Sequence, residues 1–363
     1  MGTDSNTASG QYSLAGGTGS TASGNRSVAI GQIVEASGEN SIAFGNRTVS
    51  SSNDSVATGF KTTASGAYAV SMGYQNTASN IASAAFGQGN ISSGYASFAT
   101  GRSATASGDD SFAAGSYASA TGAQSHAEGQ YTIASGEGSH VEGVGFAAGS
   151  YTEASGKASH AEGRATKASA FASHAEGSDS IASGSSSHAE GSVTKAYGVA
   201  SHTEGSITYT SEGSAYAHAE GYYTKAIGAA SHAEGGYGVQ GTNRYYTEAI
   251  GKASHAEGMH TIASGDYSHA EGQGNFGPAA VVASGVASHA EGKTTTASGE
   301  ASHAEGSYSA ANGYYSHAEG YHTTAASMAT HAEGYYTSAN LSYQHVQGQY
   351  NVVDSSKYAD IVG

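Results

Sequence analysis

The sequence predicts an all-β repeat solenoid, and three observations lead to this fold class. Gly contributes 54 of the 363 residues, Cys and Trp are absent, Pro occurs once, and 12% of the residues are charged. Gly recurs every 14 residues along most of the chain, and each interval holds two short segments in which small and variable side chains alternate. Large aliphatic residues are too scarce for a conventional core, so the chain must stack thin layers of small side chains. Disorder would not keep such a register, and the many regularly spaced Gly and β-branched residues oppose a helix.

The repeat is aligned on the Gly that ends the motif Ser-Val-Ala-Ile-Gly at residues 27–31, and 23 equivalent glycines lie between Gly17 and Gly348. Each unit contains two half-turns. The first reads Ser-x-Ala-x-Gly, as at residues 41–45, and the second reads Thr-x-Ala-Ser-Gly, as at residues 132–136. Each half-turn alternates with a period of two, which is typical of a short β-strand. Two strands and two turns per repeat describe one coil of a parallel β-solenoid.

The alternation also predicts which side chains point into the coil. The third position of each half-turn is almost always small, as at Ala43, Ala127 and Ala134. A coil of 14 residues is narrow, so only small residues fit inside it. The Thr of the second half-turn, such as Thr132, is expected to point inward as well, and a flat outer Thr array of the ice-binding kind is therefore not predicted.

The second and fourth positions of the first half-turn must then face outward together. In the N-terminal third these positions are apolar, and the following residues are expected to form one stripe: Val28, Ile30, Ile42, Phe44, Val70 and Met72. A stable monomer does not leave a continuous apolar stripe in water. We therefore predict that the stripe is a seam between chains related by rotation about the axis of a rod. The alternative is a wider monomeric coil that these side chains fill.

From residue 125 onward the first half-turn changes to Ser-His-Ala-Glu-Gly. His and Glu replace the apolar residues of the stripe, so we place them on the same seam. Representative pairs are His126 and Glu128, His160 and Glu162, His188 and Glu190, His232 and Glu234, and His303 and Glu305. The net charge of −16 comes mainly from this row, because its 14 Glu leave 15 acidic residues against 13 Lys and Arg. The charge is thus no evidence for a basic partner, and no basic patch predicts binding of nucleic acid.

Stacked carboxylates about 4.8 Å apart repel one another, so a compensating charge is expected at each level. We expect His of one chain to pair with Glu of its neighbour, with many imidazoles protonated near neutral pH. The stability of the assembly should then be lost between roughly pH 7 and 9. Metal binding by His and carboxylate and a pH-triggered disassembly switch are alternatives. A uniform row offers no distinct catalytic constellation, so the chain is predicted not to be an enzyme and is assigned no metal or cofactor.

The repeat resembles a known family. Ser-Val-Ala-Ile-Gly with a second Ala-Ser-Gly half at this period is similar to the head repeat of trimeric autotransporter adhesins (the YadA-like or Hep/Hag repeat) over residues 7–348. The resemblance implies a left-handed parallel β-roll, a homotrimeric rod and a role in surface adhesion. The Ser-His-Ala-Glu-Gly form and the segments 343–348 and 357–363 look more like phage and prophage tail-fibre proteins of Gram-positive bacteria. No signal peptide, heptad stalk or C-terminal membrane barrel is visible, which favours the fibre.

These observations divide the chain into three parts. Residues 1–124 are a β-roll with an apolar seam, and residues 125–348 are a β-roll with a His/Glu seam. Residues 349–363 are a cap or a junction to a further module. No apolar run approaches the roughly 18 residues of a membrane span, so no membrane insertion is predicted. We expect a virion tail fibre or an extracellular, cell-surface protein.

Three insertions interrupt the register after Gly143, Gly235 and Gly272, adding six, nine and six residues. All three follow the same turn of the coil, so they should project from one edge, where solenoids commonly bind partners. Their aromatic residues are candidates for stacking on a host-surface glycan or anchoring to a protein receptor: Phe146, Tyr237, Tyr245, Tyr246 and Phe276. The alternative is a purely structural filament that binds no receptor.

Overall fold

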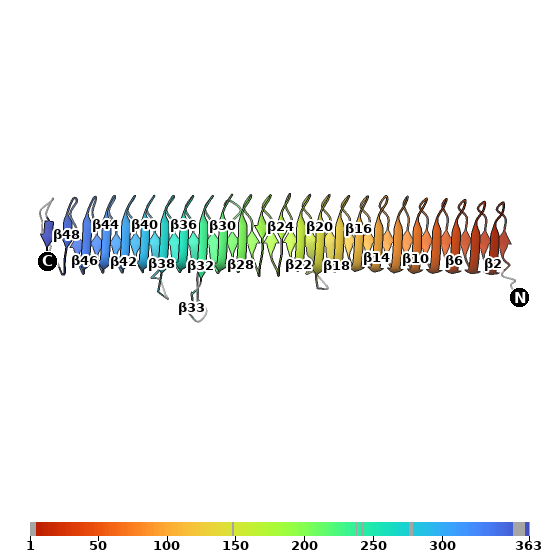
Figure 1. Ribbon diagram of the computed structural model, residues 1–363, viewed down its shortest axis with the longest axis horizontal. Helices are drawn as coiled ribbons and strands as arrows, with labels where there is room; N and C mark the ends of the chain where they lie inside the picture. Colours follow the sequence, from red (N-terminus) through yellow and green to blue (C-terminus); the bar gives the residue numbers. More distant parts are fainter. Residues whose placement is uncertain are drawn as a thin grey trace. The chain divides into compact units, whose positions relative to one another are not determined.

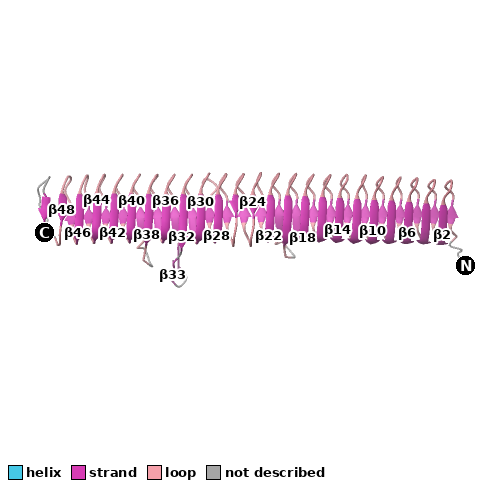
Figure 2. Cartoon of the chain, in the orientation of Figure 1, coloured by secondary structure: helices cyan, strands magenta, loops and turns pink. Residues whose placement is uncertain are grey.

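The computed structural model of the chain describes residues 5–146, 149–236, 238–240, 243–275, 279–350 and 360–362. All regular secondary structure in these residues is β-strand (Figures 1 and 2). The same residues contain no helix long and apolar enough to cross a membrane. Contacts between Cα atoms divide the chain into two compact units, unit one (residues 1–179) and unit two (residues 180–363). The predicted all-β class is confirmed.

Each coil of unit one contributes a long strand, mostly of five residues, and a short strand, and strands of each kind form a parallel ladder. The long-strand ladder contains β2 (Leu14–Thr18), β4 (Val28–Gln32), β6 (Ile42–Asn46), β8 (Val56–Phe60), β10 (Val70–Tyr74), β12 (Ala84–Gln88), β14 (Phe98–Arg102), β16 (Phe112–Ser116), β18 (His126–Gln130), β20 (His140–Val144), β22 (His160–Arg164) and β24 (His174–Ala175). The short-strand ladder contains β1 (Thr7–Ala8), β3 (Thr21–Ala22), β5 (Glu35–Ala36), β7 (Val49–Ser50), β9 (Thr63–Ala64), β11 (Thr77–Ala78), β13 (Ile91–Ser92), β15 (Thr105–Ala106), β17 (Ser119–Ala120), β19 (Thr132–Ala134), β21 (Thr152–Ala154) and β23 (Lys167–Ala168).

Unit two is built from the same two kinds of strand. Its long-strand ladder contains β26 (His188–Ala189), β28 (His202–Ser206), β30 (His218–Tyr222), β32 (His232–Gly236), β36 (His255–Met259), β38 (His269–Gln273), β40 (His289–Lys293), β42 (His303–Ser307), β44 (His317–Tyr321), β46 (His331–Tyr335), β48 (His345–Gln347) and β49 (Asp360–Val362). Its short-strand ladder contains β25 (Ile181–Ala182), β27 (Lys195–Ala196), β29 (Tyr209–Thr210), β31 (Thr224–Ala226), β35 (Thr247–Ala249), β37 (Thr261–Ala263), β39 (Val281–Ala283), β41 (Thr296–Ala297), β43 (Ala310–Ala311), β45 (Thr324–Ala325) and β47 (Ser338–Ala339).

Strands of the same kind pair in register with the corresponding strand of the next coil. Val28 of β4 lies beside Ile42 of β6. The insertions do not disturb this pairing, because His232 of β32 lies beside His255 of β36 although nine extra residues separate them. Equivalent positions are therefore stacked, and a repeated motif becomes rows of equivalent side chains. The predicted parallel solenoid of 14-residue coils is confirmed.

The core between the two ladders consists mainly of alanines. In unit one, Ala29 of a long strand and Ala36 of a short strand belong to one buried cluster. The corresponding cluster of unit two is also built from Ala, with Val281 and Val346 as the larger members. Methyl groups fill the narrow space between facing strands at normal packing density. The prediction that the third position of each half-turn points inward is confirmed.

Small polar side chains line the rest of the interior. Thr132 and Thr152 are 0% exposed, which confirms that the Thr of the second half-turn points inward. The Ser that begins the first half-turn is buried too. Its hydroxyl closes the preceding turn, as where Ser302 Oγ donates a hydrogen bond to the Gly299 carbonyl oxygen at 2.7 Å. Such bonds satisfy hydroxyl groups that burial would otherwise leave without a partner.

The insertions leave the coil at one corner, between a long strand and the short strand that follows it. In unit two, the insertion between β32 and β35 contains the antiparallel hairpin of β33 (Gly238–Gln240) and β34 (Asn243–Tyr245), which projects below the long strands in Figure 1. A further insertion lies between β38 and β39. In unit one, the insertion between β20 and β21 contains an antiparallel bridge between Phe146 and Ser150. The insertions thus sit at the predicted corner within each unit.

Candidate binding surfaces

The second and fourth residues of each Ser-x-Ala-x-Gly motif form a row on the outer face of the long strands, called the seam row below. In unit one the predicted seam residues are half-buried or exposed on this face: Val28, Ile30, Ile42, Phe44, Val70 and Met72. Their outward orientation is confirmed, and the alternative of a wider coil that they fill is wrong. Their role as a seam between chains stays a prediction.

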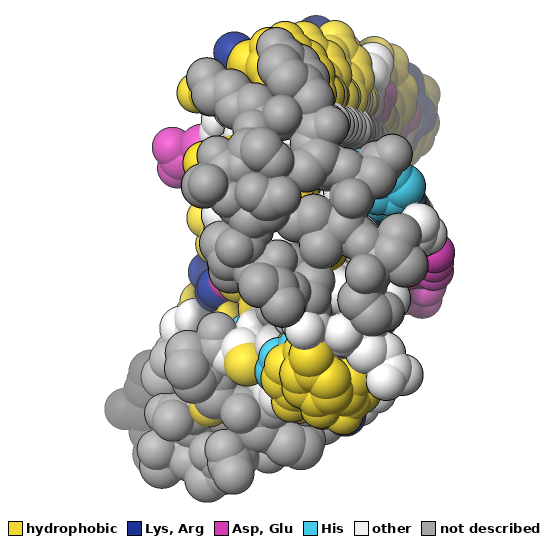
Figure 3. Space-filling view, turned by 90° about the vertical axis from the view of Figure 1, so that its left-hand side faces the viewer, with side chains coloured by type: hydrophobic (Ala, Val, Ile, Leu, Met, Phe, Trp, Pro, Cys, Tyr) yellow, Lys and Arg dark blue, Asp and Glu magenta, His cyan; other side chains and the backbone are white. Residues whose placement is uncertain are grey.

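Imidazole rings are stacked along the seam row. In unit one, His140 and His160 stack with their ring centroids 4.7 Å apart. In unit two the stack continues from His188 to His345, with neighbouring centroids 4.6–4.9 Å apart. Acidic side chains lie next to the imidazoles on the same side of the molecule (Figure 3). The parallel register creates this stack, because it repeats each ring at the spacing of the strands.

Many of the His side chains lie beside the Glu of their own Ser-His-Ala-Glu-Gly motif. The distance from Nε2 to Oε2 is 3.5 Å for His126 and Glu128, 3.8 Å for His160 and Glu162, 3.6 Å for His188 and Glu190, 3.6 Å for His232 and Glu234, and 3.7 Å for His303 and Glu305. These distances exceed a hydrogen bond, and the partly exposed pairs contribute little to stability. The nearest carboxylate in the described structure therefore belongs to the same chain, whereas pairing with a neighbouring chain stays untested.

Burial lowers the pKa of many imidazoles in the seam row, and the positive charge that adjacent imidazoles would carry lowers it further. The pKa lies below the ordinary value of 6.5 for His140, His160, His218, His232, His269, His289 and His317. The neighbouring Glu carboxylates raise the pKa but do not outweigh these two effects. In a single chain these seven imidazoles are therefore mainly neutral near pH 7. The expectation that many imidazoles are protonated concerned pairing with Glu of a neighbouring chain, and it stays a prediction.

At Glu220, a proton can reduce the repulsion between stacked carboxylates of the seam row. A hydrogen bond between the Glu220 and Glu204 side chains raises the pKa of Glu220 to about 7, and a second one with Glu234 acts in the same direction. The bond with Glu220 lowers the pKa of Glu204. A protonated Glu220 thus separates two carboxylates. At this level the row compensates its own charge without an imidazolium.

The neighbouring nitrogens and oxygens also raise the question of a metal ion. In unit two, His202, Glu204 and His218 offer ligand atoms that lie within 4.8 Å of one another. The three residues offer two imidazole nitrogens and one carboxylate oxygen, whereas structural zinc sites have four protein ligands. Metal binding by the seam row stays an alternative to a stacked polar surface.

The predicted receptor-binding aromatic residues fall on different insertions. Phe146 is 50% exposed on the insertion of unit one. At the base of the hairpin in unit two, Tyr245 ends β34 and Tyr246 lies between β34 and β35. Tyr237 and Phe276 lie outside the described residues. Of the predicted residues that the structure describes, only Tyr246 contributes to the cavity of unit two.

This cavity of about 290 Å³ lies beside the hairpin. Lys195, Tyr209 and Lys225 line it from three successive short strands that pair in register. Arg244 and Tyr246 line it from the hairpin side. The sequence predicted Tyr246 and missed the three cationic residues. The two lysines could have been found from their position in the repeat. Each is the middle residue of a Thr-x-Ala segment, and this position is stacked from coil to coil.

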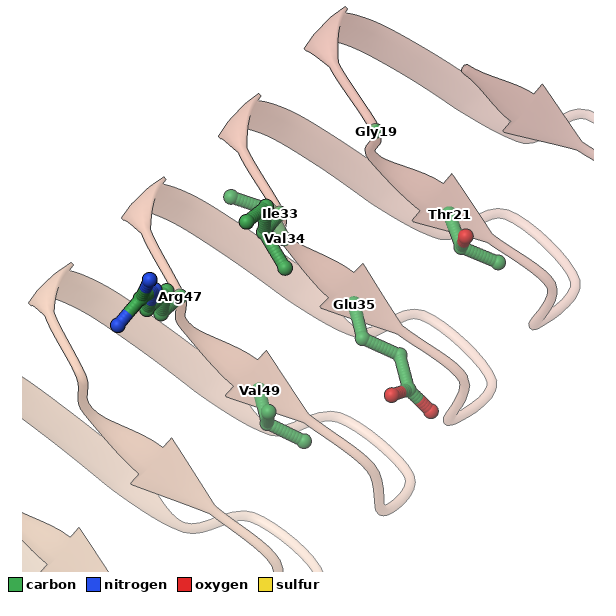
Figure 4. Close-up of a pocket in the computed structure, with 7 residues that line it drawn as sticks. All are labelled: Gly19, Thr21, Ile33, Val34, Glu35, Arg47 and Val49. Carbon is green, nitrogen blue, oxygen red and sulfur yellow. The ribbon is translucent and has the colours of Figure 1, made fainter. Parts of the chain in front are cut away.

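Unit one has a cavity of about 380 Å³ at the equivalent place on its coils (Figure 4). The middle positions of its second half-turns hold Thr21, Glu35 and Val49. Ile33 and Arg47 lie in the turns between a long strand and the next short strand. One Arg and one Glu leave this groove with no excess charge. The groove is therefore a general consequence of the coil shape, whereas the cationic and aromatic lining in unit two is a local feature.

Comparison with protein families finds repeated matches to one model, described as the YadA head domain repeat (2 copies). The matched segments are residues 8–32, 36–62, 64–90, 92–118, 249–268 and 290–316. They lie in both units, on coils with apolar seam residues and on coils with His and Glu. No curated protein matches the chain.

Proposed function

The chain carries YadA head domain repeats, and we propose that it assembles from three identical copies into an adhesive fibre. Repeats of this family support an adhesin-like trimeric fibre that is exposed at a surface. Within this class we propose the tail fibre of a phage or prophage, because the Ser-His-Ala-Glu-Gly form is repeated through unit two. The head of a bacterial surface adhesin is the second candidate. The partners proposed are two further copies of the chain and a glycan or protein on a host surface.

The seam row is the observation that carries the proposed trimer. Ile30 and Phe44 remain 37% and 38% exposed in a single chain, and an apolar row of this kind is typical of an interface. In unit two, the Nε2 atoms of His202 and His255 are buried without a hydrogen-bond partner among the described residues. A second chain packed on the row would supply such partners. The lowered imidazole pKa values favour this arrangement, because neutral rings cost less to bury than charged ones.

The mass of the purified chain in solution tests the trimer. Light scattering after size exclusion should give the mass of three chains of 35.9 kDa. Phe98, which stacks between Phe86 and Phe112 in the seam row, is the site for a disruptive variant. Phe98→Asp should shift the mass toward one chain, because it places a charge in the proposed interface.

The matched control is Tyr68→Asp, since Tyr68 is 63% exposed outside the seam row. Its mass should remain that of three chains. A wild-type mass of one chain would overturn the proposed trimer. An unchanged mass for Phe98→Asp, with circular dichroism showing intact strands, would place the interface elsewhere.

Attachment to cells tests the adhesive role against a purely structural filament. Removing residues 236–244 deletes nine residues and restores the 14-residue spacing between Gly235 and Gly258. The intact trimer should bind host cells, and the shortened trimer should bind them less. Equal binding by both would exclude the hairpin as the receptor site. An intact trimer that binds no cell from a panel of bacterial surfaces would favour the structural filament.

A further inference from the structure

We propose that the cavity beside the hairpin of unit two binds an acidic saccharide, a sugar chain that carries carboxylate, phosphate or sulfate groups. This inference rests on the proposed adhesive function and assigns a ligand class to it. The cavity combines three cationic side chains with two tyrosine rings at one place on a chain whose net charge is −16.

The cationic groups come from separate elements that converge on the cavity. Lys195 lies in β27 and Lys225 in β31, and Tyr209 of β29 is stacked between them in the short-strand ladder. Arg244 approaches from β34 of the hairpin, so the insertion completes the site. Lysine and arginine are the residues that recognise carboxylate and phosphate oxygens, and the arginine fork can bind them with two hydrogen bonds.

The cations are not cancelled by neighbouring acids. Lys225 Nζ lies 2.8 Å from Glu248 Oε1 in the next short strand. Lys195 and Arg244 form no ion pair with any residue that the structure describes. Arg244 lies over the ring of Tyr223, with the guanidinium carbon 5.3 Å from its centroid. Three cations against one carboxylate leave an excess of positive charge that a ligand can neutralise.

The tyrosines provide the surface on which a sugar ring can lie. The Lys225 ammonium is 3.5 Å from the centroid of Tyr246, which fixes this ring at the edge of the cavity. Tyr246 also contacts Tyr223 edge-on, with the centroids 5.5 Å apart. Aromatic rings offer an apolar face and a hydroxyl group together, which suits the alternating C–H and O–H surface of a sugar. A cavity of about 290 Å³ with convergent polar groups is close in size to small-ligand sites.

The groove of unit one shows that this lining is not imposed by the coil. At the equivalent middle positions it has Thr21, Glu35 and Val49, and no insertion adds to it (Figure 4). Its single Arg47 is matched by Glu35. The same backbone therefore accommodates a groove without net charge, and the cations and tyrosines of unit two require another reason, which ligand binding supplies.

Binding of defined saccharides to the full-length chain tests the proposal. The probes are an oligogalacturonate, a sulfated heparin oligosaccharide, a phosphorylated oligosaccharide and neutral dextran, measured by calorimetry at two salt concentrations. We expect at least one acidic probe to bind, more weakly at high salt, and dextran not to bind. The variant Lys195→Gln/Arg244→Gln should weaken that binding by about 10-fold or more.

The control variant is Lys293→Gln, which removes one positive charge from an exposed position of unit two outside the cavity. Its affinity should stay within about two-fold of the unchanged chain. Equal binding by Lys195→Gln/Arg244→Gln and the unchanged chain would overturn the assignment. So would equally tight binding of poly-glutamate, because it would show charge attraction without recognition of a sugar. If Lys195→Gln/Arg244→Gln loses saccharide binding but still attaches to cells, the cavity is not the adhesive site. The proposed adhesive function would then remain, with its site elsewhere on the chain.

Discussion

Gly306 shows at the residue scale how closely neighbouring coils approach. Its φ of +94° lies in the region that L side chains rarely adopt, and a Cβ atom there would lie 2.2 Å from the carbonyl oxygen of Gly320 in the next coil. Gly320 stands in the same relation to Gly334. The glycine spacing that first revealed the repeat is therefore a steric requirement of stacking, met again at each coil.

Replacing this glycine should destabilise the fold. Gly306→Ala is expected to lower the free energy of unfolding by more than about 1 kcal/mol, because strain and backbone clash add together. Gly236→Ala is the matched control, since its Cβ would meet no atom within 4 Å, and it should change the free energy by less than about 0.5 kcal/mol. Thermal unfolding followed by circular dichroism measures both. Similar midpoints for the two variants would contradict the steric account.

The sequence predicted individual residues well where a period of two decides the outcome. Ala43 and Thr132 point inward as expected, because alternation along a strand leaves no other choice. The lowered pKa of His232 in a single chain was not predicted. Its pKa depends on burial and on the stacked His255, and neither quantity can be read from the spacing of His and Glu along the chain.

At the scale of elements, rows of like side chains follow from the parallel register. Tyrosines of neighbouring coils stack in this way: the ring centroids of Tyr321 and Tyr335 lie 5.1 Å apart, and those of Tyr336 and Tyr350 lie 5.4 Å apart. The row of imidazoles is the longer example. Each ring inside the row is stacked between two others, so protonation of one imidazole disfavours protonation of its neighbours, as for His218 between His202 and His232.

This element should make the chain sensitive to acid. His232, His269 and the other shifted imidazoles have folded-state pKa values below 6.5, so the unfolded chain binds more protons just below that pH. Their contribution to the free energy of unfolding is complete above pH 6.5 and is lost as pH falls through the folded-state pKa values.

Glu220 acts in the opposite sense, because its pKa of about 7 exceeds the ordinary 4.5. Its contribution is present at low pH and is lost as pH rises toward 7. Several imidazoles outweigh one carboxyl, so the thermal midpoint should fall from about pH 7 to about pH 5.

Phenylalanine can replace a histidine in this row without removing the stack, as Phe98 and Phe112 show in unit one. His269→Phe should reduce the fall of the midpoint on acidification. His322→Phe is the control, because His322 stacks on Tyr308 at a coil corner outside the seam row, and it should leave the fall unchanged. A midpoint that stays constant between about pH 7 and 5, or falls instead between about pH 7 and 9, would contradict the neutral row.

The binding cavity marks where prediction of elements from sequence ended. Lys195 and Lys225 occupy the middle positions of short strands, and their outward orientation followed from alternation. Their convergence with Arg244 did not, because the hairpin follows no repeat. Periodicity specifies which residues stack within a ladder, but the path of an insertion depends on contacts that the repeat does not encode.

At the scale of the whole molecule, a solenoid is held together by contacts between adjacent coils. In the described ladders, each strand pairs with the corresponding strands of the coils before and after it. These ladders contain no pairing between strands of distant coils. Stability is then close to a sum of coil and interface terms. The fold class was predictable from sequence for this reason, since one repeat unit specifies every coil. The association of chains stays a prediction, because a seam row defines a face but not the number of copies around it.

Removal of a whole coil tests this additive picture. Deleting residues 293–306 takes out one 14-residue repeat and joins Gly292 to Ser307, so every later His remains in the long-strand ladder. The thermal midpoint should fall by only a few degrees, since one coil and one interface are lost. Deleting residues 300–306 takes out half a coil and would move His317 and all later seam residues into the short-strand ladder. That register keeps Ala inside the coil, because Ala304 and Ala311 are seven residues apart. It interrupts the seam row, however, and exchanges positive-φ glycines such as Gly320 with turn glycines such as Gly313 that lack a positive φ. The second deletion should therefore cause a larger loss of midpoint and of strand signal in circular dichroism than the first. Equal losses from the two deletions would show that unit two is stabilised by contacts beyond neighbouring coils.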